Sequence, residues 1–120
     1  MKRVVYVVDD DDDVRASVEF LLESGNIEAR PYASVVAFEA AFDPEVADCV
    51  LADLRMPGFS GLDLARRLHQ HGYSVPVIIM TGHGGSMAVE EARKAGVFDF
   101  LKKPFDGDDL FDAIDRAMAG

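Results

Sequence analysis

The fold is decided by residues 3–13, RVVYVVDDDDD, in which a continuous apolar run stops at five consecutive aspartates. An unbroken run of β-branched and apolar residues is typical of a strand that is buried on both faces of a sheet. Apolar residues then recur at helical spacing from Val14 to Leu22, and Gly25 is a suitable helix terminator. The opening of the chain therefore predicts a buried strand, an acidic turn and a helix, with Asp12 or Asp13 as the helix cap.

The same alternation of strand and helix continues to the end of the chain. The strands are expected at Arg3–Val8, Ile27–Tyr32, Cys49–Ala52, Val75–Met80 and Phe98–Leu101. The later helices are expected from Ser34, as a cap, to Phe42, around Leu62–Leu68, over Met87–Ala95 and from Asp108 to Ala117. Pro57, Gly58 and Gly61 predict a loop before the third helix. Buried strands that alternate with helices predict an α/β fold, a doubly wound parallel sheet with helices on both faces.

Polar side chains follow four of the expected strands: Asp9 and Asp10, then Asp53, Thr81 and Lys103. The carboxyl ends of parallel strands meet at one edge of a sheet, so these side chains should be neighbours. Three close carboxylates repel one another unless a cation joins them, and Mg²⁺ prefers such oxygen ligands. A carboxylate can accept a phosphoryl group, which the lysine charge and the threonine hydroxyl would contact. The sequence thus predicts a phosphoryl-transfer site with magnesium.

Composition excludes several other classes of protein. The 120 residues, the length of one domain, hold 22 acidic and 12 basic residues, a net charge of -10, which disfavours nucleic-acid binding by this domain. The single cysteine, Cys49, lies in an apolar run and is expected to be a buried structural thiol. A secretory signal and a membrane-spanning run are both absent from the sequence, so a soluble cytoplasmic domain is expected.

Four short motifs occur in order along the chain: Val7-Val8-Asp9-Asp10, Leu51-Ala52-Asp53-Leu54-Arg55-Met56-Pro57-Gly58 with Gly61, Met80-Thr81-Gly82-His83 and Lys103-Pro104-Phe105. Together they resemble the receiver domain of bacterial two-component response regulators, over essentially the whole chain. The second and third motifs look most like those of nitrogen-fixation and dicarboxylate-transport regulators. The resemblance implies one receiver domain over residues 1–120, a flavodoxin-like (βα)5 three-layer sandwich with strand order 2-1-3-4-5.

The resemblance also implies roles for the site residues. Asp53 would be the phosphoacceptor, which receives its phosphoryl group from a phosphohistidine of a sensor histidine kinase. Asp10, Asp53 and the backbone carbonyl of Arg55 would hold Mg²⁺ or Mn²⁺, and Asp9 would assist through water. Lys103 would pair with the phosphoryl group, and its peptide bond to the following proline would be cis.

A conformational switch is implied by the same resemblance. Thr81 would move toward the phosphoryl oxygen, and Phe100 would turn inward. Arg55 and His83 would tune the lifetime of the phosphoryl group. The surface of the fourth helix, fifth strand and fifth helix would then meet an output domain, an effector protein or a second phosphorylated copy. Such a domain is a phosphoacceptor and switch, whose only chemistry is its own phosphorylation and dephosphorylation, and it is not counted as an enzyme.

Two other classes use similar chemistry. A phosphatase of the haloacid-dehalogenase type also needs Mg²⁺ and a nucleophilic aspartate, and the spacing of Asp9 and Asp11 fits it. The following Asp12 and Asp13 do not fit its threonine-bearing loop, and the chain is short for that fold. A flavodoxin-like FMN-binding protein needs a phosphate-binding loop after the first strand, where the five aspartates would repel phosphate.

Overall fold

The computed structural model describes residues 2–82 and 86–119, and a parallel five-stranded sheet forms its centre. The strands of this sheet are β1 (Val4–Val8), β2 (Glu28–Tyr32), β3 (Cys49–Asp53), β6 (Val77–Thr81) and β7 (Asp99–Lys102). Their order across the sheet is β2-β1-β3-β6-β7, and every neighbouring pair is parallel. This confirms the expected order 2-1-3-4-5, since β6 and β7 are the fourth and fifth strands of the main sheet.

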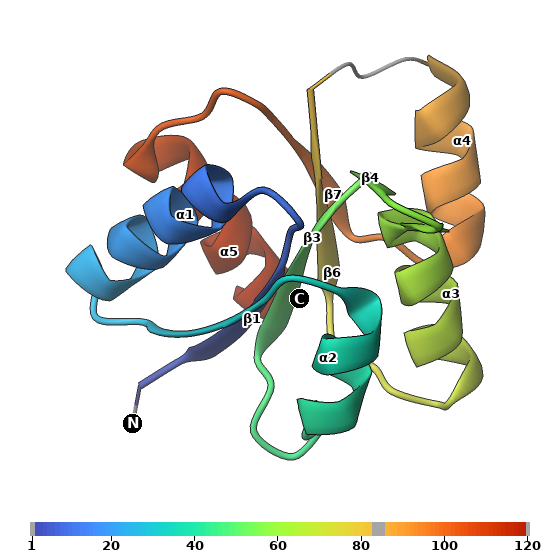
Figure 1. Ribbon diagram of the computed structural model, residues 1–120, viewed down its shortest axis with the longest axis horizontal. Helices are drawn as coiled ribbons and strands as arrows, with labels where there is room; N and C mark the ends of the chain where they lie inside the picture. The colour runs from blue at the N-terminus through green and yellow to red at the C-terminus, as the bar shows by residue number, and fades with distance from the viewer. Residues whose placement is uncertain (1, 83–85, 120) are drawn as a thin grey trace.

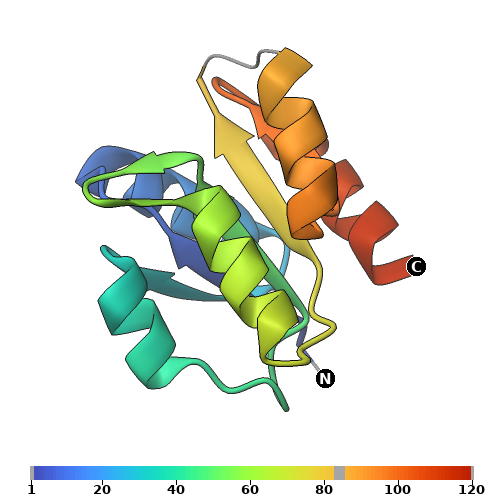
Figure 2. The ribbon, with the colours of Figure 1, turned by 90° about the vertical axis from the view of Figure 1, so that its right-hand side faces the viewer.

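Helices cover both faces of the sheet, so the molecule has three layers (Figure 1). The helices are α1 (Asp12–Ser24), α2 (Val35–Ala41), α3 (Gly61–Gln70), α4 (Ser86–Ala95) and α5 (Gly107–Ala119). Helices α1 and α5 lie on one face, and Figure 2 shows α2, α3 and α4 in front of the other. Within residues 2–82 and 86–119, no helix combines the length and the apolar character that crossing a membrane requires.

Each face of the sheet has its own apolar core, and β1 contributes to both. Val5 and Val7 pack with α1 and α5, whereas Tyr6 and Val8 pack with α2 and α3. All five residues of β1 are buried. The unbroken apolar run in the sequence therefore reflects a central strand that is covered on both sides.

Cys49, the first residue of β3, is buried as expected. Burial raises the pKa of its thiol to about 12. The thiolate is the reactive form of cysteine, so this side chain acts as a small apolar core residue.

The structure corrects several expected element boundaries. The cap of α1 is Asp11, not Asp12 or Asp13, because its carboxylate accepts hydrogen bonds from the backbone amides of Asp13 and Val14. Ser34 caps α2 as expected. Strand β6 begins two residues later than predicted, and β7 is displaced by one residue toward the C-terminus. These errors are small because strand ends are set by pairing with neighbouring strands, which a local pattern does not contain.

The predicted loop after β3 contains a small hairpin that the sequence analysis missed. Strands β4 (Arg55–Met56) and β5 (Phe59–Ser60) pair antiparallel, and Gly58 adopts a φ of 72° in the turn between them. A positive φ favours glycine, so the turn is explained by the sequence. Two-residue strands are too short to produce a periodic pattern, which is why only the turn was predicted.

Aromatic side chains fasten α2 to the sheet. Phe38 of α2 is fully buried, and its ring centroid lies 5.6 Å from that of Tyr6 and 5.0 Å from that of Phe42. The hydroxyl group of Tyr6 accepts a hydrogen bond of 3.1 Å from the backbone amide of Asp43, just after the helix. The buried ring and this bond together hold a helix of only seven residues.

Phe38→Ala should lower the free energy of unfolding by about 3–5 kcal/mol, because it leaves a cavity in this aromatic cluster. Phe20→Ala is the matched control, since Phe20 on α1 is 74% exposed whereas Phe38 is 0% exposed. The control should change stability by no more than about 0.5 kcal/mol. Urea unfolding followed by circular dichroism measures both, and equal losses would contradict the burial described for Phe38.

Candidate functional site

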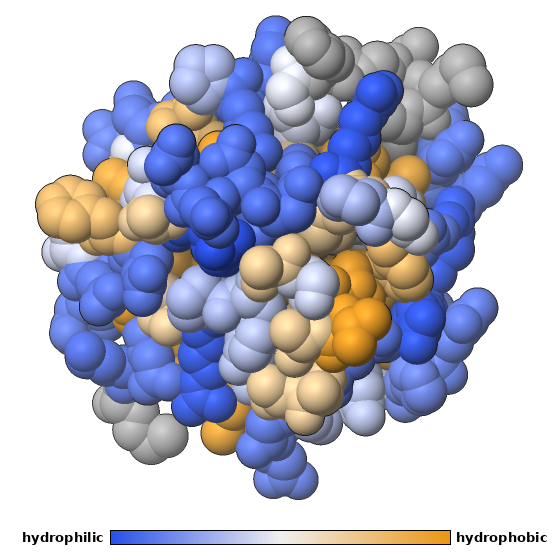
Figure 3. All heavy atoms as spheres, viewed as in Figure 1, coloured by the Kyte–Doolittle hydropathy of each residue, from blue (hydrophilic) through white to orange (hydrophobic). Residues whose placement is uncertain are grey.

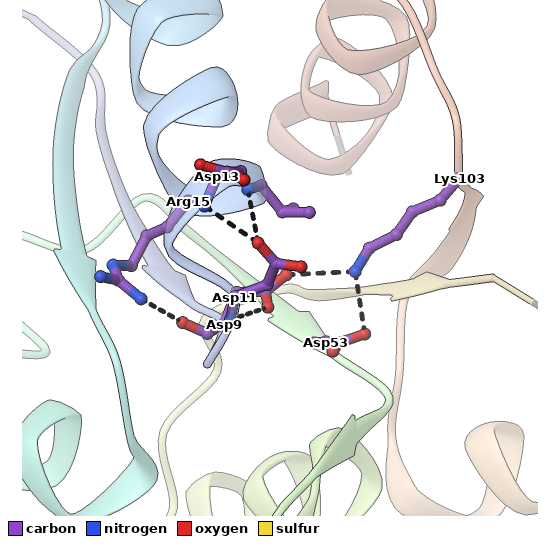
Figure 4. Close-up of polar contacts among 7 residues, drawn as sticks. Asp9, Asp11, Asp13, Arg15, Asp53 and Lys103 are labelled. Atoms are coloured by element: carbon purple, nitrogen blue, oxygen red, sulfur yellow. Dashed lines mark hydrogen bonds and ion pairs between the residues drawn. The ribbon is translucent and has the colours of Figure 1, made fainter.

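The predicted site residues meet at the carboxyl edge of the sheet. Asp9 follows β1, Asp53 ends β3, Thr81 ends β6 and Lys103 follows β7. Asp9, Asp10 and Asp53 each offer one carboxylate oxygen within 4.8 Å of those of the other two. Figure 4 shows Asp9, Asp53 and Lys103 converging from different strands. The parallel topology therefore gathers these residues as the sequence analysis expected.

Asp9 is a fully buried carboxylate with a partner for each of its oxygens. Oδ1 accepts a hydrogen bond of 2.9 Å from the backbone amide of Asp11, and Oδ2 lies 3.1 Å from the Nζ atom of Lys103. A buried charge is tolerated only when it is paired and hydrogen-bonded in this way. Asp9 is therefore part of an organised site, unlike the exposed Asp12 and Asp13 beside it.

Lys103 holds two strands of the site together through its ammonium group. Its Nζ atom lies 3.1 Å from Asp9 Oδ2 and 3.2 Å from Asp53 Oδ1. Burial alone would lower the pKa of Lys103, but the two carboxylates outweigh burial and raise this pKa above its ordinary value. The backbone amide of Lys103 donates to the carbonyl oxygen of Thr81, and the Lys103-Pro104 bond is cis, as expected.

The negative charge of Asp53 is only partly compensated by Lys103. Burial raises its pKa, and the negative charges of Asp9 and Asp10 raise it further, against the opposing attraction of Lys103. The ammonium group of Lys103 contacts the carboxylates of Asp9 and Asp53, and Asp10 adds a third carboxylate to the cluster. This surplus of oxygen donors with negative charge suits a hard divalent cation, so the residues present fit the predicted Mg²⁺.

The other predicted residues lie around this centre. Thr81 is buried at the end of β6, and Arg55 is exposed at the start of the hairpin. Phe100 on β7 is half-buried and packs against the core beneath α2, α3 and α4. His83 lies outside the described residues. On the face seen in Figure 3, hydrophilic residues cover the area where β1 ends and α1 begins, and apolar residues appear near α2.

Gly61, the first residue of α3, is a site residue whose role sequence reasoning missed. A Cβ atom at this position would lie 2.6 Å from the backbone oxygen of Asp53 and 2.8 Å from Cδ1 of Ile79. Its amide donates to the carbonyl oxygen of Leu54 over 3.0 Å. Helix α3 therefore begins directly against the backbone of Asp53. The sequence contained the glycine, but a glycine in a loop signals a turn as readily as a close contact.

Gly61→Ala should lower the free energy of unfolding by about 1–3 kcal/mol, because the added methyl group overlaps the backbone of Asp53. Gly107→Ala is the matched control at the first residue of α5, where a Cβ would lie 3.5 Å from its nearest neighbours. The control should leave stability unchanged or raise it by about 0.5 kcal/mol. Thermal and urea unfolding measure the difference, and a neutral Gly61→Ala variant would contradict the close approach.

The raised pKa of Asp53 predicts a pH dependence of stability in the metal-free protein. A carboxyl group that binds its proton more tightly when folded lowers the free energy of unfolding as pH rises, beginning near its ordinary pKa of 3.8. Asp53→Asn removes this titration, so the stability of the variant relative to wild type should increase as the pH rises above the ordinary pKa of 3.8. Urea unfolding at several pH values measures this difference in stability. If folding instead lowered the pKa of Asp53, the stability of the variant relative to wild type would decrease as pH rises.

Comparison with known proteins places the chain in a family. Residues 5–115 match the model of the response regulator receiver domain. The transcriptional regulatory protein FixJ of Azorhizobium caulinodans is 46% identical over 116 residues, which cover 97% of this chain and 54% of the relative. FixJ of Rhizobium meliloti is 42% identical over 114 residues, covering 94% of this chain and 55% of the relative. The chain thus spans about half the length of these curated relatives.

Solved structures agree with the sequence relatives. The crystal structure of FixJ-N superimposes with a TM-score of 0.88 at 38% identity, covering 99% of this chain and 95% of that chain. The response regulator StyR gives a TM-score of 0.89 at 36% identity, covering 99% of this chain and 60% of that one. These matches give no support to the phosphatase or FMN-binding alternatives. The chain belongs to the family of receiver domains of two-component response regulators.

Proposed function

We propose that residues 1–120 form one receiver domain that accepts a phosphoryl group on Asp53 from a phosphohistidine of a sensor histidine kinase. The observation that carries this proposal is the position of Asp53. Asp53 is the last residue of β3. Its carboxylate lies 3.2 Å from the ammonium group of Lys103 and forms a cluster with the carboxylates of Asp9 and Asp10. Membership of the receiver family supports the same assignment.

The proposed transfer needs little beyond positioning and charge neutralisation. A carboxylate oxygen of Asp53 attacks the phosphorus atom, and a new P–O bond forms as the P–N bond to the histidine breaks. The imidazole nitrogen keeps the electron pair of the broken bond. Lys103 already faces Asp53 and would contact the oxygens of the arriving phosphoryl group. The domain is a signalling domain, and we assign it only its own phosphorylation and dephosphorylation.

Asp10, Asp53 and the backbone carbonyl of Arg55 would hold Mg²⁺, or Mn²⁺ in its place. The metal ion would neutralise negative charge on the phosphoryl oxygens. Asp9 would assist through water, which agrees with the engagement of both its carboxylate oxygens by Asp11 and Lys103. Asp10 is exposed, so its carboxylate is accessible to an arriving ion.

Thr81 and Phe100 would transmit the effect of phosphorylation at Asp53 to the surface. In the sheet register Phe100 pairs with Ile79, which lies two residues before Thr81 and packs in the core beneath α3 and α4. Because side chains alternate along a strand, Thr81 and Phe100 project to the same face of the sheet. Movement of the threonine toward the phosphoryl group would therefore open space on the face where the phenylalanine packs.

The surface formed by α4, β7 and α5 would then meet an output domain, an effector protein or a second phosphorylated copy. Arg55 and His83 would tune the lifetime of the phosphoryl group through their positions two residues after Asp53 and Thr81. The net charge of -10 supports the absence of nucleic-acid binding by this domain itself. A signalling domain of this family would act in the cytoplasm.

Asp53→Asn should abolish labelling of the protein by acetyl phosphate in the presence of Mg²⁺, because an amide cannot form the acyl phosphate. Asp115→Asn, which changes an exposed aspartate on α5, is the matched control and should be labelled like wild type. Intact-protein mass spectrometry detects the added phosphoryl group. Full labelling of Asp53→Asn would refute the assignment, and steady turnover of a phosphate ester by the wild type would show a phosphatase instead.

A further inference from the structure

Arg15 is a charged residue beside the site to which neither the motifs nor the proposed phosphoryl transfer assigns a role. It lies in the first turn of α1, and only 20% of its side chain is exposed. Its Nη1 atom donates a hydrogen bond of 2.8 Å to the backbone carbonyl oxygen of Asp9. Its Nη2 atom pairs with the carboxylate of Asp12. Figure 4 shows Arg15 and Lys103 approaching Asp9 from opposite sides.

We propose that Arg15 is a positioning residue, which holds the chain between β1 and α1 so that Asp10 can bind the metal ion. The carbonyl group that Arg15 contacts belongs to the peptide unit joining Asp9 to Asp10. Fixing the direction of that carbonyl fixes the plane of the peptide, and hence where the backbone of Asp10 begins. This inference rests on the metal site of the proposed function.

The other contacts of this segment leave that peptide unit dependent on Arg15. The amide of Asp9 is bound to the carbonyl of Tyr32 on β2, and its side chain is bound to Asp11 and Lys103. The bond to Tyr32 lies before the Asp9–Asp10 peptide, and the Asp11 amide that binds the Asp9 side chain belongs to the next peptide, between Asp10 and Asp11. Asp10 itself is exposed. Among the side-chain hydrogen bonds described for this segment, the bond from Arg15 is the one made to the peptide that leads into Asp10.

An arginine is suited to this task because its planar guanidinium group donates in two fixed directions at once. One donor reaches the backbone of Asp9, and the other is oriented by Asp12, three residues earlier on the same helix. A lysine at position 15 carries its three N–H donors on one nitrogen atom of a flexible side chain, so it would hold the two acceptors less firmly than the planar fork of arginine. Arg15→Lys should therefore fall between wild type and Arg15→Ala.

Charge and geometry make opposite predictions for Arg15, which gives a sharp test. Removing a cation near a divalent metal site should strengthen metal binding if electrostatic repulsion were the main effect. Removing a residue that positions a metal ligand should weaken it, and losses of such supporting contacts are about 10–100-fold. The direction of the change in Mg²⁺ affinity therefore distinguishes the two.

The experiment is a titration of wild type and variants with MgCl₂, without any phosphodonor, followed by the amide resonances of Asp9, Asp10 and Asp53 in NMR spectra. Arg15→Ala should weaken Mg²⁺ binding about tenfold and should shift the Asp10 amide already in the metal-free protein. The double variant Arg15→Ala/Asp12→Ala leaves the net charge unchanged and should be weakened similarly. Arg93→Ala removes an arginine from another i,i+3 ion pair, on α4, and should bind Mg²⁺ like wild type.

Each outcome bears on a different claim. Unchanged or tighter Mg²⁺ binding by Arg15→Ala, or a double variant that binds like wild type, would overturn the positioning role. A wild type that binds no Mg²⁺ would overturn the metal site of the proposed function, and the inference with it. Circular dichroism and thermal unfolding of each variant check that the fold is kept, and weakened binding in a fully folded Arg15→Ala supports the proposal.

Discussion

The structure depends on the ammonium group of Lys103, which lies between the carboxylates of Asp9 and Asp53. The two contacts join residues 94 and 50 positions apart in the sequence. They also connect β7 to β1 and β3, so one side chain binds three strands at the same edge of the sheet. Asp9 is fully buried, and a buried carboxylate needs such a partner to offset the loss of its hydration. The fold and the site are therefore stabilised by the same interaction.

This compensation is incomplete, because the site holds more carboxylates than ammonium groups. The ammonium group contacts Asp9 and Asp53 while Asp10 adds a third carboxylate, and the pKa of Asp53 is raised by burial and by its acidic neighbours. The remaining negative charge favours a cation, while the backbone around Asp53 is held by β3 on one side and by Gly61 on the other. A carboxylate that is fixed in place but poorly neutralised suits phosphoryl transfer, in which positioning and charge neutralisation matter most.

The sequence pattern was sufficient for the strands and for placing Asp9, Asp10, Asp53, Thr81 and Lys103 at one edge of the sheet, because buried strands and their polar ends leave a strong pattern. The sheet order came from the resemblance to receiver domains. The sequence pattern was insufficient where the structure depends on contacts between distant segments. The cap at Asp11, the short hairpin, and the closeness of Gly61 to Asp53 leave no periodic signal. The bond from Arg15 to the backbone oxygen of Asp9 also leaves no signal in the sequence, since every residue carries the same backbone acceptor.

The two separate cores described above have a consequence for how such a molecule can move. Ile79 and Phe100 belong to the layer beneath α2, α3 and α4, and Thr81 projects toward the same side. Val5, Leu51 and Ile114 belong to the other layer, beneath α1 and α5. A rearrangement at the end of β6 can therefore be confined to one layer. The opposite layer would serve as a rigid support, so that the chain changes its surface without loosening its whole interior.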